Sequence, residues 1–158
     1  FMFFMNGVQH LSISKLQLLM EVRLLRRYSR QSGWKFQPQI FPIGVRSYLK
    51  VDGYCEKQKV VCEVWAHVGK PKSAQINKIM KDALKMIFLD RIQGPIRKVL
   101  IFGDADAMKP FEENKWISLC LKKYNIKLVL IQFKAVEKRT LLKTQGDQRE
   151  GMKRGKHR

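Results

Sequence analysis

Asp52 and Glu63 are two acidic residues in a stretch whose pattern predicts a β-hairpin. The largely apolar run at 60–66 predicts a strand, and the polar residues 54–59 before it contain no proline and predict a turn. Because side chains alternate across a strand, the two carboxylates meet at one edge of the sheet if the hairpin closes in a suitable register. Carboxylates at close range repel each other, and a bound divalent cation relieves that repulsion. The pair therefore predicts a site for Mg²⁺ or Mn²⁺.

This hairpin resembles the PD-(D/E)XK nuclease superfamily, which has an Asp on one strand, a Glu on the next and a functional residue two positions later. The order of elements over 16–133 is similar as well. The chain departs from the pattern at Trp65, which stands where the superfamily has its Lys, and no Pro precedes Asp52. The resemblance implies that Asp52 and Glu63 are catalytic metal ligands, with the Val64 carbonyl as a further oxygen ligand. It also implies hydrolysis of phosphodiester bonds in DNA.

The catalytic cation then has to come from another position. Lys50, Lys70 and Lys72 are the predicted replacements, because each lies close to the hairpin in the sequence. Gln75 falls in the first turn of the next predicted helix, and it matches a Gln that some superfamily members place near the metal or its water. Trp65 has two interpretations, since its ring could stack on a base or could fill an inactive site.

Four further polar residues each have a catalytic and a structural interpretation. Glu21 is the acid of the predicted helix at 15–30 and is similar to a Glu that some superfamily members bring to the metal; an ion pair with a surface Arg is the more frequent role. His67 shares a strand face with the glutamate of the pair and could act as a base, although a single His at a strand end is more often structural. Asp104 and Asp106 follow an apolar strand and form a rival acidic site, with turn formation as the alternative.

The charge of the chain indicates a polyanionic partner. Lys and Arg number 32 against 13 Asp and Glu, which gives a net charge of +19. A globular protein this basic usually meets nucleic acid, and DNA is expected ahead of RNA. The alternative is a cationic surface that serves only solubility. The side chains expected to contact nucleic acid are Lys50, Lys70, Lys72, Lys78, Lys81 and Lys85.

Cysteine usage and hydropathy exclude other classes. Three Cys without a C-x-x-C spacing indicate neither a disulfide framework nor a zinc site. The apolar residues 1–5 are too few for a membrane span, and they lack the features of a signal peptide. A cytoplasmic protein without a membrane partner is expected, and whether it forms a homodimer is left open.

The remaining pattern predicts the elements that position the acidic pair. Helix 15–30 is expected to bury Leu18, Val22 and Leu25, while the Arg residues near its C-terminal end complement the helix dipole. In chain order the other expected elements are an extended connection at 34–42, the hairpin at 49–66, a helix at 73–91, a strand at 98–102, a helix at 111–123 and a strand at 126–133.

Fully apolar strands on either side of a helix predict a parallel βαβ unit that is buried on both faces. The expected fold class is therefore α/β: a restriction-endonuclease-like, single-domain, three-layer sandwich whose mixed central sheet contains the hairpin and the βαβ unit. This domain covers residues 1–142. Residues 143–158 are rich in Gly, Lys and Arg and are expected to form a flexible basic tail that adds phosphate contacts.

Two classes of function remain. The first is a metal-dependent nuclease, and the second is a catalytically inactive nucleic-acid-binding module on the same fold. Three acids lining one pocket, Glu21, Asp52 and Glu63, would favour the enzyme. A salt bridge from Glu63 to a lysine of the following loop, with Trp65 filling the cleft, would favour the module.

Overall fold

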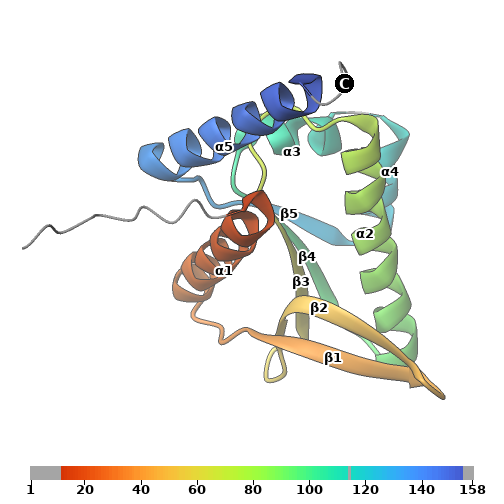
Figure 1. Ribbon diagram of the computed structural model, residues 1–158. Coiled ribbons are helices and arrows are strands. Elements are labelled where there is room, and N and C mark those ends of the chain that lie inside the picture. The colour runs from red at the N-terminus through yellow and green to blue at the C-terminus, as the bar shows by residue number, and fades with distance from the viewer. Residues whose placement is uncertain (1–11, 114, 155–158) are drawn as a thin grey trace, which may run out of the picture.

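A five-stranded sheet forms the centre of the protein, with helices on both of its faces (Figure 1). The computed structural model describes residues 12–113 and 115–154. In chain order the elements are α1 (Ile13–Ser32), β1 (Gln37–Gly44), β2 (Ser47–Cys55), β3 (Val60–Trp65), α2 (Ser73–Gln93), β4 (Arg97–Phe102), α3 (Ala105–Glu112), α4 (Trp116–Lys123), β5 (Ile126–Leu130) and α5 (Ala135–Arg154).

The sheet is mixed, and its strands follow the order β1-β2-β3-β4-β5. β1, β2 and β3 pair antiparallel, whereas β3, β4 and β5 pair parallel. The predicted hairpin is therefore β2–β3, and the predicted parallel unit is β4–β5, which α3 and α4 connect. Helix α2 makes a further crossover between parallel strands, from β3 to β4. The predicted α/β class with a mixed sheet, a hairpin and a parallel βαβ unit is confirmed.

Two hydrophobic cores lie on opposite faces of the sheet. One packs α2, α3 and α4 against the sheet, and the other packs α1 and α5 (Figure 1). Strand β3 divides its side chains between them as the alternation predicts: Val61 and Trp65 belong to the first core, and Cys62 and Val64 to the second. Glu63 alternates with Cys62 and Val64, so its side chain lies on the α2 side of the sheet.

The buried stripe of α1 differs from the predicted one. Leu16, Met20 and Leu24 face the core, and Leu24 is 0% exposed. Leu18 is 62% exposed and Val22 39%, although Leu25 is buried as expected. The helix carries apolar residues on two adjacent sides, so periodicity alone could not decide which side meets the sheet.

Two other segments also differ from prediction. The helix expected at 111–123 is two helices, because α3 ends at Glu112 and α4 starts at Trp116 after a cap in which Ser118 Oγ accepts the Lys115 N–H at 3.2 Å. Residues 143–154, expected to be a flexible tail, continue helix α5. Lys, Gln, Glu and Arg favour helix in this segment, and Leu141 anchors α5 in the core with α1. Residues 155–158 of the expected tail lie outside the described part of the chain.

Candidate active site

The acidic pair lies where β2 and β3 separate. The ladder between these strands ends at Gly53 opposite Cys62, and the preceding part of β2 pairs with β1 instead. The backbone N–H of Val64 therefore lies beyond the β2–β3 ladder, and it donates to a side chain of β2 instead, Asp52 Oδ2 at 2.8 Å. Asp52 therefore occupies the notch between the two strands, beside the glutamate of β3.

Glu63 is 4% exposed and is paired with a lysine from α2. Lys85 Nζ lies 2.6 Å from Glu63 Oε1 and 3.2 Å from Asp82 Oδ1, one turn earlier on the same helix. Asp52 lies close enough to Glu63 to raise the pKa of its carboxyl group. The carboxyl group of Glu63 is consequently enclosed between another carboxyl group and an ammonium group.

The cluster is short of positive charge. Burial and then Asp52 raise the pKa of Glu63, Lys85 lowers it, and the resulting pKa is about 9. Burial and then Asp52 likewise raise the pKa of Glu21 to about 7. At neutral pH the Asp52–Glu63 pair therefore retains a proton, which a divalent cation could displace.

Substituting Glu63 by Gln is expected to change the pH dependence of stability. The folded-state pKa of Glu63 lies above its ordinary value, so its contribution to stability is full below about pH 4.5 and is lost as the pH rises through about 9. Each pH unit in that window costs the wild type up to about 1.4 kcal/mol relative to Glu63→Gln. Urea unfolding of both proteins at about pH 5, 7 and 9 measures this difference in the free energy of unfolding. A free-energy difference between wild type and Glu63→Gln that is constant with pH would contradict the raised pKa of Glu63.

A cavity of about 270 Å³ opens beside the cluster on the α1 side of the sheet. Glu21 and Asp52 both line it, together with Lys50 and Arg26. The predicted meeting of the acid of helix α1 with Asp52 is thus present, whereas Glu63 lies behind Asp52 and does not line this cavity. Asp52 in the notch connects the two sides of the sheet.

The donor set of the cluster fits a hard divalent cation. Asp52 and Glu63 offer carboxylate oxygens only, which suits Mg²⁺ or Mn²⁺ rather than zinc. Within residues 12–113 and 115–154, no group of three or more His, Cys, Asp or Glu side chains could hold a metal ion. Two protein carboxylates are enough for Mg²⁺, which usually keeps several waters in its coordination shell.

Trp65 and His67 pack against each other. Trp65 is buried, and its ring stacks on that of His67 with centroids 3.9 Å apart. Lys78 Nζ lies 5.5 Å from the centroid of the Trp65 ring. His67 Nδ1 accepts a hydrogen bond from Gln17 Nε2 at 3.1 Å, and burial followed by Lys78 lowers the pKa of His67 to about 4. His67 is therefore neutral at pH 7, with Nδ1 already engaged.

The residues of the loop after β3 lie at the start of α2. Gln75 Oε1 accepts the backbone N–H of Lys72 at 2.8 Å, so the Gln side chain caps the helix. Lys70 and Lys72 are exposed, and the ion pair of Glu63 is formed by Lys85 instead. The sequence predicts Lys85 only as a contact to nucleic acid.

Asp104 has a structural role in the described part of the chain. Its Oδ2 accepts the Gly69 N–H at 2.8 Å, and its Oδ1 pairs with Lys138 Nζ at 2.8 Å. Asp104 thereby ties the loop before α2 to helix α5. Asp106, two residues later, is exposed in the first turn of α3.

The spacing of charged residues on α2 was a signal in the sequence for Lys85 as the partner of Glu63. Lys78, Asp82 and Lys85 stand at i, i+4 and i+7, so they share one face of the helix. The sequence assigns the lysines of this face to contacts with nucleic acid, with a solvated surface as the alternative. In the structure this face meets β3, because Lys85 pairs with Glu63 and Lys78 lies over the Trp65 ring.

No protein-family model matches the chain, and a search of curated proteins finds no match. The chain is similar in structure to an XisH family protein from Nostoc punctiforme PCC 73102, whose crystal structure superposes with a TM-score of 0.48 and 15% sequence identity. The superposition covers 72% of this chain and 91% of that protein. None of the described helices is long and apolar enough to cross a membrane.

Proposed function

We propose that the protein is a metal-dependent nuclease that hydrolyses phosphodiester bonds in nucleic acid, DNA ahead of RNA, at the cluster of Asp52, Glu63 and Lys85. The observation that carries the proposal is the buried Glu63 carboxyl group, held between Asp52 and the Lys85 ammonium at the point where β2 and β3 separate. It combines two oxygen ligands and one cation in a single notch.

Phosphodiester hydrolysis requires an activated water and positive charge beside the phosphate oxygens. A divalent cation bound by Asp52 and Glu63 would supply Lewis acidity and a water of lowered pKa. Both carboxylates would hold that cation through their oxygens, and Asp52 is fixed for the task by its hydrogen bond from the Val64 N–H.

Lys85 supplies the cation that the position of Trp65 lacks. Burial alone would lower the pKa of Lys85, but Glu63 and Asp82 outweigh it and place the pKa above its ordinary value. Lys85 therefore keeps its proton. It orients Glu63 and adds a fixed positive charge at the notch, where charge develops on the phosphate.

Glu21 is suited to proton exchange in the same cavity. Its pKa of about 7 leaves comparable amounts of the acid and the carboxylate at neutral pH. It lines the cavity together with Asp52, so it can pass a proton to or from a group bound there.

A second candidate function is an inactive nucleic-acid-binding module. Trp65 favours it, because a buried aromatic ring occupies the position that the superfamily gives to a catalytic Lys. On this interpretation the contact between Lys85 and Glu63 is only a buried structural contact between α2 and β3.

Cleavage of labelled oligonucleotides separates the two candidates. Single-stranded DNA, duplex DNA and RNA are incubated with Mg²⁺ and wild type, Glu63→Gln or the exposed control Asp106→Asn. Glu63→Gln keeps an oxygen that faces Lys85 but removes the charge, so cleavage should be lost in this variant and in EDTA, yet retained in the control. Tight binding without cleavage by the wild type would establish the module instead.

A further inference from the structure

A second charged feature lies on the other side of α1, in a hollow between this helix and the start of α5. This arginine groove has a volume of about 510 Å³. Five cationic side chains surround it with one carboxylate among them. Its charged lining residues are Arg23, Arg26, Arg27, Arg30, Lys134 and Glu137.

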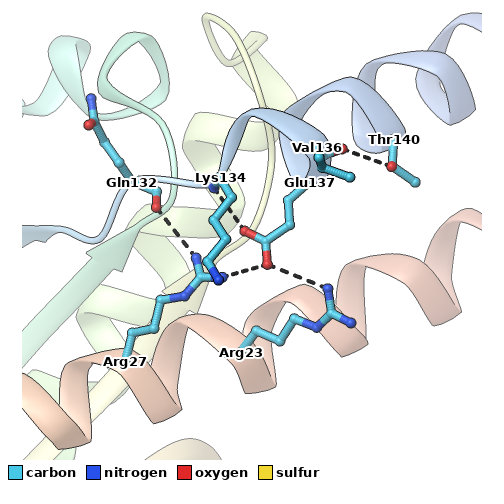
Figure 2. Close-up of polar contacts among 7 residues, drawn as sticks. All are labelled: Arg23, Arg27, Gln132, Lys134, Val136, Glu137 and Thr140. Atoms are coloured by element: carbon cyan, nitrogen blue, oxygen red, sulfur yellow. Dashed lines mark hydrogen bonds and ion pairs between the residues drawn. The ribbon is translucent and has the colours of Figure 1, made fainter.

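Glu137 contacts two arginines and a backbone N–H at the groove, as Figure 2 shows. Its Oε1 lies 2.5 Å from Arg27 Nη2 and 3.4 Å from Arg23 Nη1. Its Oε2 accepts the backbone N–H of Lys134 at 2.9 Å, and Arg27 Nη1 also donates to the Gln132 carbonyl at 3.4 Å. Two guanidinium groups are thus fixed in position before any ligand arrives.

The single carboxylate does not neutralise the groove. Both oxygens of Glu137 are already engaged inside the wall, and its side chain is 7% exposed. Burial alone would raise the pKa of Glu137, but Arg27 and Arg23 outweigh it and lower the pKa, so the carboxylate stays ionised. Arg26 and Arg30 are exposed and form no ion pair with any residue whose position the structure describes. The groove is left with a surplus of positive charge.

The groove adjoins the candidate active site. Arg26 lines both the arginine groove and the cavity that contains Glu21 and Asp52. A polyanion that enters that cavity therefore meets the arginines on the next side of α1. This adjacency distinguishes the groove from a basic patch elsewhere on the surface.

We propose that the arginine groove binds the phosphate backbone of the nucleic acid strand whose scissile bond lies at the acidic cluster. This proposal rests on the proposed function for the identity of the polyanion. Guanidinium groups bind phosphate oxygens through paired N–H donors. Because Glu137 already holds Arg23 and Arg27, less side-chain freedom is lost on binding.

The arginine groove takes over a role that the sequence assigns to lysines, namely contact with nucleic acid. Lys85 turns inward to Glu63, and Lys78 lies against the Trp65 ring. Two of the six predicted lysines are thus engaged within the protein. The arginines of α1, which the sequence explains by the helix dipole, face α5 and the groove instead.

Fluorescence polarisation with a labelled oligonucleotide tests the groove in the Glu63→Gln background, where the strand is expected to remain intact. The test variant is Arg26→Gln with Arg30→Gln, since both side chains are exposed and lie outside the Glu137 ion pairs. The matched control is Lys122→Gln with Lys123→Gln, which removes the same charge from α4 on the other face of the sheet. The test variant should weaken binding by about tenfold or more and lower the slope of log K against log salt by about two.

Equal weakening by both double variants would mean that only bulk charge matters, and it would overturn the proposal. Displacement of the oligonucleotide by polyglutamate at equal charge concentration would overturn it in favour of an acidic peptide. Arg30→Gln alone should give about half the change in slope, which guards against a folding defect in the double variant. Binding is measured here without cleavage. A protein that does not cleave nucleic acid can therefore still show binding at the groove, and failure of one proposal is distinguishable from failure of the other.

Discussion

Replacing Lys85 by Met is expected to lower the single-turnover rate of cleavage by about 10²–10³-fold while the affinity for the substrate changes little. Lys85 is 2.6 Å from Glu63 and only partly exposed, so its charge acts at the notch rather than on the outer surface. A fixed cation there stabilises the transition state more than the ground state, where the phosphate charge is less localised. Rates at saturating enzyme and dissociation constants with Ca²⁺ in place of Mg²⁺ measure the two effects.

Lys81→Met is the matched control for this prediction. Lys81 is an exposed lysine one turn before Lys85 on the same helix, so the substitution removes the same charge from the surface of α2. It should weaken binding slightly and leave the saturated rate unchanged. If Lys85→Met reduced rate and affinity in equal proportion, Lys85 would hold phosphate only, and its assignment to the catalytic cluster would be wrong.

Mn²⁺ is expected to bind more tightly as the pH rises, by about tenfold per pH unit below pH 9. The Asp52–Glu63 pair retains a proton because burial and mutual repulsion raise the pKa of Glu63 to about 9. A metal ion has to displace this proton, so the apparent affinity follows the fraction of the pair that is deprotonated. Isothermal titration at several pH values, in buffers of different ionisation enthalpy, gives both the affinity and the number of protons released.

Glu63→Gln should abolish this binding, and Asp106→Asn should leave it intact, since Asp106 is an exposed acid of α3 outside the cluster. Binding that is independent of pH would show that no proton is displaced. Equal binding by wild type and Glu63→Gln would place the metal elsewhere on the chain.

Local patterns in the sequence predicted the hairpin, the parallel unit and the acidic pair. Alternation along 60–65 assigned Glu63 and Val64 to opposite faces, and the structure confirms this through the two cores. The separation of β2 from β3 at Asp52 was not predictable, because it depends on where β1 takes over the pairing. No local signal encodes that competition between strands.

Side-chain contacts between elements that are distant in the sequence could not be predicted either. Lys85 is one of several lysines on α2, and nothing in its neighbours along the chain separates the one that reaches Glu63 from those in solvent. The same holds for Arg23 and Arg27, whose partner Glu137 is more than a hundred residues away in the sequence. Helical periodicity predicts that such side chains share a face, but the element that this face contacts is determined only by tertiary packing.

The most direct measurement is cleavage of an oligonucleotide with Mg²⁺ by wild type and Asp52→Asn, purified in parallel and assayed across the final gel-filtration peak. Asn retains an oxygen that can accept the Val64 N–H, so the notch can keep its shape while the charge is lost. Asp52 and Glu63 together should hold the metal, so cleavage should follow the wild-type protein peak and be absent from the Asp52→Asn peak. Cleavage of equal strength in both peaks, or in neither, would contradict a hydrolytic centre at Asp52, Glu63 and Lys85.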